Sequence, residues 1–283
     1  MGALDKKIDF AVVFSVKNAN PNGDPLNGNR PRQNFDGFGE VSDVCIKRKI
    51  RNRLQDLGEA IFVQSDDRAN DGFKSLNDRA DSIPELSKMK KDGKKSNPDA
   101  FAALASSTWY DVRAFGQVFA FKGSALSVGV RGPVSVHPAI SLQPINITST
   151  QITKSVNSVT GEGKSSDTMG MKHRVDFGVY KFVGSINTQL AEKTGFTYED
   201  ALKLKEALVT LFENDASSAR PEGSLEVHKV YWWEHDNKLG QYSSAKVHKL
   251  LQIDMPEDAK EFDESWITLN SLDGLKVEEL NGK

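Results

Sequence analysis

The sequence of 283 residues contains a single cysteine, Cys45. One cysteine excludes an internal disulfide framework and cannot by itself form a thiolate zinc site. Long apolar runs are also missing. Stretches such as FAVVF at 10–14 are too short to span a bilayer, and MGALDKKID at the N-terminus lacks the apolar centre of a signal peptide. We therefore expect a cytoplasmic protein.

Several signatures of metal and nucleotide sites are absent as well. The sequence has no HExxH, no CxxC pair and no GxxxxGK[ST]. The loop NANPNGDPLNGNRP at 18–31 has asparagines spaced like calcium ligands. An EF-hand, however, needs several carboxylates and a bidentate glutamate at its twelfth position, where this loop has Asn29. We expect no metal and no cofactor.

Charge is distributed unevenly along the chain. Residues 254–283 carry nine acidic residues against three lysines, a net charge of −6, whereas the whole chain is at −2. Residues 1–253 therefore sum to +4. The segment IKRKIRNRL at 46–54 contains five basic residues and no acidic one. A cluster of this kind favours binding to a polyanion.

This basic cluster lies on a predicted helix. Either Ser42 or Asp43 is its N-cap, and it ends near Gly58. One stripe is apolar and is expected to be buried, and it comprises Ile46, Ile50, Leu54 and Leu57. The basic residues flank that stripe as two rows, for which we expect no acidic partner one turn away: Lys47, Arg48 and Arg51 on one shoulder, and Lys49 and Arg53 on the other. The alternative is a solvated face whose long side chains cover the core.

Periodicity predicts the elements around this helix. Residues 8–17 alternate as a half-buried strand does, and strands are also expected at 115–121, 126–131, 177–187 and 225–233. A second helix begins at Thr197, where Asp200 completes a capping pair. The order strand, helix, strands, helix, strand predicts an α+β fold of the split βαβ type, a ferredoxin-like or RRM-like sheet.

Two long polar insertions interrupt this plan. Residues 66–108 include the lysine-rich KMKKDGKK at 88–95 and are expected to form an exposed lobe. Residues 140–175 alternate Thr and Ile in part, which favours a protruding hairpin. Its end, TMGMKH at 168–173, places two methionines beside a lysine and a histidine. Apolar side chains that wedge between bases, next to cations that hold phosphate, are a device of nucleic-acid binding.

Six blocks of sequence together resemble one known family. They are NPNGDP at 20–25, SDVCIKRKIRN at 42–52, YDVRAFG at 110–116, VRGPV at 130–134, TMGMKH at 168–173 and AEKTGF at 191–196. In this order they are similar to the backbone subunit of CRISPR Cascade complexes, subtype I-C. The resemblance runs from residue 8 to about 253 and leaves the acidic segment outside.

The resemblance implies a fold and a function. Its members are guide-RNA-binding subunits with an RRM-like palm and inserted finger and thumb regions, and they are not enzymes. Several copies polymerise along one guide RNA, which then pairs with target DNA in antiviral defence. The implied partners are guide RNA, other copies, the large subunit and the subunit that binds the 5' handle of the guide. The expected regions are palm at 1–65, finger at 66–108, palm strands at 109–139, thumb at 140–175, palm at 176–253 and an acidic tail at 254–283.

The resemblance also assigns roles to residues of this sequence. Asn20 and Asn22 would offer amide donors to RNA, and Gly23 would let backbone N–H groups approach phosphate. In the alternative interpretation these asparagines only hold a turn, which Asp24 favours because its carboxylate repels phosphate. Lys47, Arg48 and Arg51 are expected to bind phosphate, whereas Lys49 and Arg53 would contact a neighbouring subunit.

Two further motifs receive roles in the same way. Arg131 in VRGPV would reach phosphate, or alternatively bond local carbonyls. Met169 or Met171 would be the wedge at a displaced base, with Lys172 and His173 beside the backbone; methionine is also a common core residue.

Two other functions remain open from the sequence. A metal-independent guide-processing ribonuclease could use His173 with Lys172, Arg174 and Tyr180 as acid, base and oxyanion stabiliser. A stand-alone RRM-like RNA-binding module would keep the phosphate contacts and act as a monomer. The phenylalanines of RAFGQVF at 113–119 only partly match the stacking motif of RRM proteins, and we expect them in the core.

Overall fold

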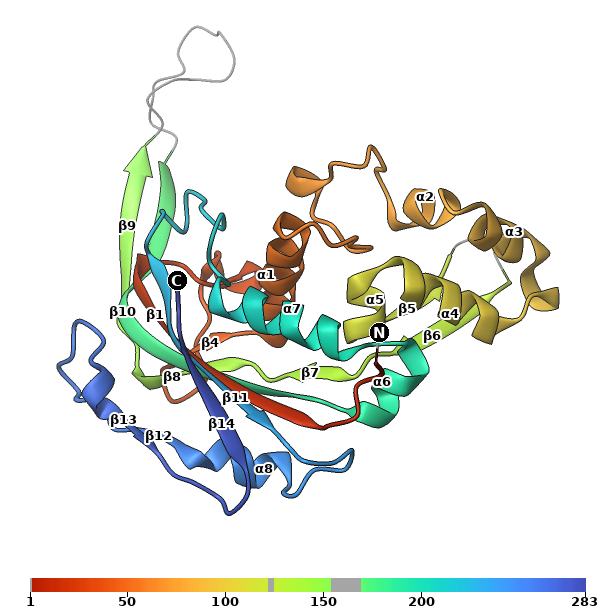
Figure 1. The fold of residues 1–283 in the computed structure, drawn as a ribbon. Coiled ribbons are helices and arrows are strands. Elements are labelled where there is room, and N and C mark those ends of the chain that lie inside the picture. Colours follow the sequence, from red (N-terminus) through yellow and green to blue (C-terminus); the bar gives the residue numbers. More distant parts are fainter. Residues whose placement is uncertain (1, 122–124, 154–168) are drawn as a thin grey trace, which may run out of the picture.

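The structure is a computed structural model that describes residues 2–121, 125–153 and 169–283. Its described strands form one large sheet and three small ones, and every strand pair is antiparallel (Figure 1). The large sheet has the order β14-β11-β1-β10-β8-β4, and β7 and β9 also pair with β10. The bounds are β1 Ile8–Ala19, β4 Phe38–Val41, β7 Val134–Val136, β8 Ala139–Pro144, β9 Ile147–Thr153, β10 Met169–Ile186, β11 Leu225–Glu234 and β14 Lys276–Asn281. The expected α+β class is confirmed.

The central strand β1 is buried on both faces, which corrects the expectation of a half-buried strand. Phe10, Val12 and alternate residues pack under α1 (Asp43–Asp56) and α7 (Tyr198–Val209). Ala11 and Val13 pack on the opposite face, in a second cluster. The sheet is therefore covered on both sides at its centre.

Both predicted helices begin at the predicted caps. The Ser42 hydroxyl accepts a hydrogen bond from the backbone N–H of Cys45 at the start of α1. Thr197 and Asp200 form a reciprocal capping box at the start of α7. A short helix, α6 (Thr188–Thr194), precedes α7 and was not predicted. None of the described helices combines the length and apolar character that a membrane crossing requires.

The acidic C-terminal segment is folded onto the sheet, which corrects its interpretation as a tail. The other face of the sheet carries α8 (Ser244–Val247) and a hairpin of β12 (Leu251–Ile253) and β13 (Ile267–Leu269). After that hairpin, β14 pairs with β11 and becomes an edge of the large sheet. Apolar side chains spaced between the acidic residues drive this packing, and they include Met255, Phe262, Trp266, Leu272 and Leu275.

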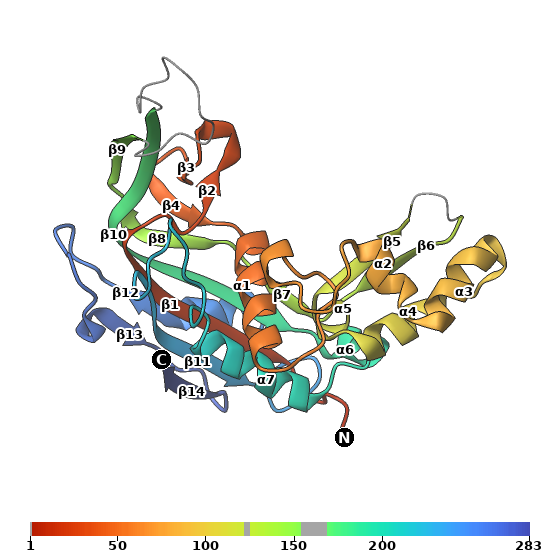
Figure 2. The ribbon, with the colours of Figure 1, turned by 90° about the horizontal axis from the view of Figure 1, so that it is seen from above.

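Residues 62–131 form a lobe beside the sheet with a hydrophobic core of its own (Figure 2). Its elements are α2 (Leu76–Asp81), α3 (Pro84–Asp92), α4 (Pro98–Thr108), α5 (Tyr110–Phe115) and the hairpin of β5 (Gly116–Ala120) with β6 (Ser127–Arg131). Phe119 contacts Phe62 and Phe101 in this core, as expected of the phenylalanines. The strands β5 and β6, however, belong to the lobe and not to the large sheet, because their apolar faces pack on its helices.

One buried carboxylate joins the lobe to α1. Asp111 has no exposed surface and accepts hydrogen bonds from the backbone N–H groups of Phe62 (2.7 Å) and Val63 (3.0 Å). Its third donor is the Arg51 guanidinium, whose Nε lies 2.9 Å away. A buried charge of this kind is stable only when it is fully paired. A second link joins Arg113 of α5 to Asp200 of α7 in a bidentate pair.

We predict that Asp111→Ala lowers the free energy of unfolding by about 3 kcal/mol or more, because it leaves a guanidinium and two N–H groups without their acceptor. Urea unfolding measures this. The control is Glu261→Ala, which removes an exposed pair with Lys17 and should change stability by about 0.5 kcal/mol at most. Equal effects of the two substitutions would contradict the role of Asp111.

Candidate nucleic-acid interface

The asparagine-rich loop after β1 is held by its own side chains. Asn20 is 5% exposed, and its Nδ2 donates to the backbone carbonyl of Asn29 (2.8 Å). Asn22 Oδ1 accepts from both the backbone N–H and the hydroxyl of Ser42, each at 2.9 Å. The amide of Asn22 thus ties the loop to the N-cap of α1. This geometry supports the interpretation in which the asparagines hold a turn.

Gly23 begins a small hairpin of β2 (Gly23–Asp24) and β3 (Arg30–Pro31). A Cβ atom on Gly23 would lie 2.0 Å from Oδ1 of Asn29. The missing side chain therefore makes room for Asn29, whose own φ is +59°. This internal contact accounts for the glycine without a phosphate.

The basic helix has acidic partners, contrary to the expectation from the sequence. Lys47 pairs with Asp43 one turn earlier, with Nζ and Oδ2 3.1 Å apart. Both side chains are partly exposed, so the pair contributes little to stability and leaves Lys47 accessible to a ligand.

Arg48 and Arg51 connect α1 to the lobe. Arg48 donates to the backbone carbonyl of Val63 (2.7 Å), and burial lowers the pKa of its guanidinium, although the group stays charged. Arg51 pairs with Asp111 and lies over the ring of Phe115, 5.0 Å from its centroid. Arg51 is therefore an anchor of the lobe, which corrects its expected place at the surface.

Lys49 and Arg53 both contact residues of their own chain. Lys49 is 4% exposed and forms a salt bridge with Asp215. Burial lowers the pKa of Lys49, and the nearby Asp215 carboxylate opposes that shift. Arg53 Nε donates to the Thr210 hydroxyl at 2.7 Å. These two residues therefore attach α1 to the segment that follows α7.

A groove opens between α1, residues 65–70 and residues 214–220, with a cavity volume of about 610 Å³. Its cationic side chains are Arg48, Lys49, Arg68 and Arg220, and its acidic ones are Asp56, Asp67 and Asp215. Arg68 is oriented by Asp56 (2.8 Å), and Arg220 by Asp215 (3.1 Å). Fixed, partly exposed guanidinium groups are suited to phosphate.

The remaining wall of the groove is polar. Amide side chains line it, and among the described residues three of its oxygens, Asn52 Oδ1, Gln55 Oε1 and Ser65 Oγ, have no hydrogen-bond partner. Buried polar atoms without partners are costly, so this wall favours a polar ligand. Neither Arg68 nor Arg220 was expected from the sequence. Each lies far from the basic cluster along the chain and comes near α1 only in the folded protein.

The VRGPV motif lies at the base of the lobe. A Cβ on Gly132 would lie 2.3 Å from the backbone oxygen of Ala114, so the bend packs closely against α5. Arg131 is exposed at the end of β6 and has no ion pair with another described residue. Arg131 is therefore accessible to a ligand, but it lies on the lobe and does not line the groove.

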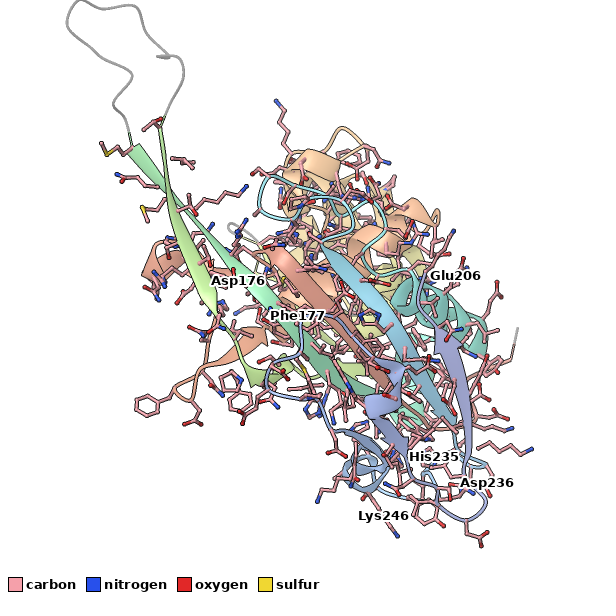
Figure 3. All side chains as sticks on the ribbon, turned by 90° about the vertical axis from the view of Figure 1, so that its left-hand side faces the viewer. Asp176, Phe177, Glu206, His235, Asp236 and Lys246 are labelled. Carbon is pink, nitrogen blue, oxygen red and sulfur yellow. The ribbon has the colours of Figure 1, made fainter. Side chains whose placement is uncertain are left out.

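The hairpin of β9 and β10 extends beyond the sheet, from the point where Asp176 and Phe177 are labelled in Figure 3. Of the expected thumb at 140–175, residues 154–168 lie outside the described residues. Met169 and Met171 are 62% and 55% exposed, so they are not core residues.

Strand alternation separates the residues of TMGMKH. Met169, Met171 and His173 share one face of the hairpin, where His173 Nδ1 lies 2.8 Å from Ser149 Oγ. Lys172 points to the opposite face. Of the expected residues in this motif, only His173 therefore shares a face with the two methionines.

The groups of the ribonuclease alternative are not brought together. Tyr180 follows His173 by seven residues on the same strand, a separation of about 23 Å. Tyr180 is fully buried in the sheet, and burial raises the pKa of its hydroxyl. Within the described residues there is also no cluster of His, Cys, Asp and Glu that could hold a metal ion.

Comparisons with known proteins agree on one family. Residues 6–270 match the family described as "CRISPR-associated protein Cas7". A protein of that name from Haloferax volcanii is 28% identical over 267 residues, which cover 87% of this chain and 74% of that protein. The family match extends beyond residue 253, where the resemblance was expected to end.

Two solved structures also show a partial likeness. One, described as "CRISPR RNA-guided surveillance complex, pre-nicking", has a TM-score of 0.49 at 14% identity and covers 80% of this chain and 78% of its own. Another, "CRISPR RNA-guided surveillance complex", has a TM-score of 0.43 at 14% identity, with 80% and 68% covered.

We predict that Asn22→Ala lowers the free energy of unfolding by about 1–2 kcal/mol, because the N–H and hydroxyl of Ser42 lose their acceptor. Asn27→Ala, on the exposed turn of the same loop, is the control and should leave stability unchanged. Thermal or urea unfolding distinguishes the two. If Asn22→Ala were as stable as the wild type, Asn22 would not hold the loop, and only its expected role in ligand binding would remain.

Proposed function

Because the chain belongs to the CRISPR-associated Cas7 family, we propose that it is the repeating backbone subunit of a Cascade-type complex and binds guide RNA along its length. The single observation that carries RNA binding by this chain is the groove beside α1. It combines Arg48, Arg68 and Arg220 with amide side chains. Such a surface recognises the sugar–phosphate backbone and leaves sequence recognition to base pairing.

The arrangement of the sheet supports an RRM-like palm. The order β11-β1-β10-β8 places the fourth, first, third and second strands of a split βαβ unit side by side. The helices α1 and α7 cover one face, as that plan requires. In this proposal the lobe at 62–131 is the finger, and the β9–β10 hairpin is the thumb.

The exposed face of the hairpin supports a role beside the bases. Met169 and Met171 project from a two-stranded ribbon into solvent, where they contribute nothing to the core. An apolar side chain in that position can wedge between bases and displace one of them. His173 lies on the same face as the methionines. Lys172 lies on the opposite face, where it would contact an RNA backbone that passes on that side.

We propose that the protein is not an enzyme. The groups able to act as acid and base, His173 and Tyr180, lie seven residues apart along β10, and Tyr180 is buried in the sheet. The groove offers cations and amides, which bind a phosphate backbone without cleaving it. The proposed partners are guide RNA, target DNA through that guide, further copies of this chain, the large subunit and the subunit at the 5' handle; the six sequence motifs favour subtype I-C.

We predict that Arg68→Ala combined with Arg220→Ala lowers affinity for single-stranded RNA about tenfold, whatever its sequence. The slope of log affinity against log salt should also fall by about 0.7 for each phosphate group that the variant no longer neutralises. Fluorescence anisotropy over a salt series measures both quantities. The control is Lys246→Ala with Lys249→Ala. It removes two exposed lysines in and just after α8, on the side of the sheet opposite α1. If the slope of log affinity against log salt changed equally in both double variants, the RNA would not bind in the groove.

We also predict that Met171→Ala keeps most of the RNA affinity but removes a regular pattern of reactive bases in chemical probing of bound RNA. The physical reason is that the wedge displaces bases and does not bind phosphate. Ile152→Ala is the matched control, since Ile152 is 49% exposed on the opposite face of the hairpin. If wild-type complexes show no periodic pattern, the wedge is refuted.

A further inference from the structure

The wall of the groove contains oxygen atoms that lack a hydrogen-bond donor. Among the described residues they are Oδ1 of Asn52, Oε1 of Gln55 and Oγ of Ser65, and all three are buried. Neither amide atom of Asn52 forms a hydrogen bond with another described residue. Ser65 precedes the 3₁₀ turn Asp66–Arg68, but its hydroxyl makes no capping bond there. A ligand that satisfies this wall must therefore donate hydrogen bonds to it.

These acceptors lie next to the arginines of the groove. Asn52 follows Arg48 by one helical turn, so both side chains project from the same side of α1. Gln55 donates through Nε2 to the backbone carbonyl of Arg68 (2.9 Å), and Ser65 precedes that arginine by three residues. The groove thus alternates groups suited to phosphate with groups that need a donor.

Charge alone does not select one kind of nucleic acid here. Four cations and three carboxylates line the groove, which leaves a net charge of +1. Two of the carboxylates, Asp56 and Asp215, are paired with arginines of the groove. Burial lowers the pKa of Arg48, and the nearby carboxylate of Asp67 opposes that shift. The weak positive field attracts the phosphates of RNA and DNA alike.

The donors of a nucleic-acid backbone distinguish RNA from DNA. Phosphate oxygens only accept hydrogen bonds, so they cannot satisfy an orphaned acceptor. The backbone of a DNA strand has no donor along its length, whereas RNA has one in every nucleotide, the 2'-hydroxyl. This hydroxyl both donates and accepts, and the amide of Asn52 therefore pairs with it in either orientation.

We propose that the groove selects RNA over DNA because Asn52, Gln55 and Ser65 accept hydrogen bonds from ribose 2'-hydroxyl groups. The neighbouring guanidinium groups hold the adjoining phosphates. This inference rests on the proposed function, since it concerns how the same groove recognises its strand. The three neutral side chains determine specificity, whereas the arginines contribute affinity for either kind of strand.

The test compares the affinity of the full-length protein for single strands of equal length at one salt concentration. The strands are oligouridine, oligodeoxyuridine and 2'-fluoro-oligouridine, because fluorine keeps the sugar shape of RNA but cannot donate a hydrogen bond. Fluorescence anisotropy measures each affinity. Oligouridine should bind about tenfold more tightly than either of the other two strands. The same ratios should be found when cytidine replaces uridine in all three strands.

The variant Asn52→Leu removes one acceptor with little change in side-chain volume. Leucine is the better helix former and leaves no buried polar atom unpaired, so thermal stability should be unchanged or higher. The ratio of oligouridine affinity to oligodeoxyuridine affinity should fall about fivefold, with DNA affinity unchanged. Ser65→Ala should lower the same ratio. The control is Gln252→Ala, which removes an exposed amide of β12 on the other side of the sheet and should leave the ratio unchanged.

The outcomes separate this inference from the function on which it rests. A fall of the ratio in Asn52→Leu but not in Gln252→Ala, with full stability, supports recognition of the 2'-hydroxyl. Equal binding of oligouridine and 2'-fluoro-oligouridine, or ratios that change with the base, would refute it and leave the proposed function standing. So would an equal loss of RNA and DNA affinity in Asn52→Leu. A wild-type protein that binds no oligouridine would refute the proposed function and this inference together.

Discussion

The buried carboxylate of Asp111 is the constraint on which the candidate interface depends. It accepts two backbone N–H groups of the chain entering the lobe and the guanidinium of Arg51 on α1. Because an unpaired buried charge is strongly unfavourable, these partners must all be in place in the folded protein. The carboxylate thereby fixes α1 against the lobe. It also fixes the lobe-side wall of the groove, since residues 65–70 continue directly from the clamped backbone at Phe62 and Val63.

Stability and the proposed binding depend on different basic residues in and around α1. Arg51 and Lys49 are paired with Asp111 and Asp215, so their charges are neutralised inside the chain. Arg48, Arg68 and Arg220 lie along the groove, where carboxylates orient the last two without burying them completely. This division explains how a cluster of five basic residues can be largely structural, while the groove beside it supplies the guanidinium groups of the proposed phosphate site.

The sequence predicted the elements whose signal is local. β1, α1 and α7 appear where alternation, helical spacing and the caps at Ser42 and Thr197 placed them. The partners of the basic helix were not predictable in this way, because Asp111 and Asp215 approach it only through the tertiary fold. The lobe core and the packed C-terminal segment were missed for a related reason: their apolar residues are sparse in the sequence and gather only when several short elements meet. In the candidate site, Arg48 was expected, whereas Arg68 and Arg220 required the fold.

The central claim is that many copies bind one guide RNA without cleaving it. The most direct measurement is the mass of complexes formed with labelled single-stranded RNAs of increasing length, with RNA integrity followed in the same samples. The account predicts that the number of bound copies rises stepwise with RNA length and that the RNA stays intact, with or without added metal ions. One copy at every length would indicate a stand-alone RNA-binding module, and cleavage abolished by His173→Ala would indicate a ribonuclease; either result would contradict it.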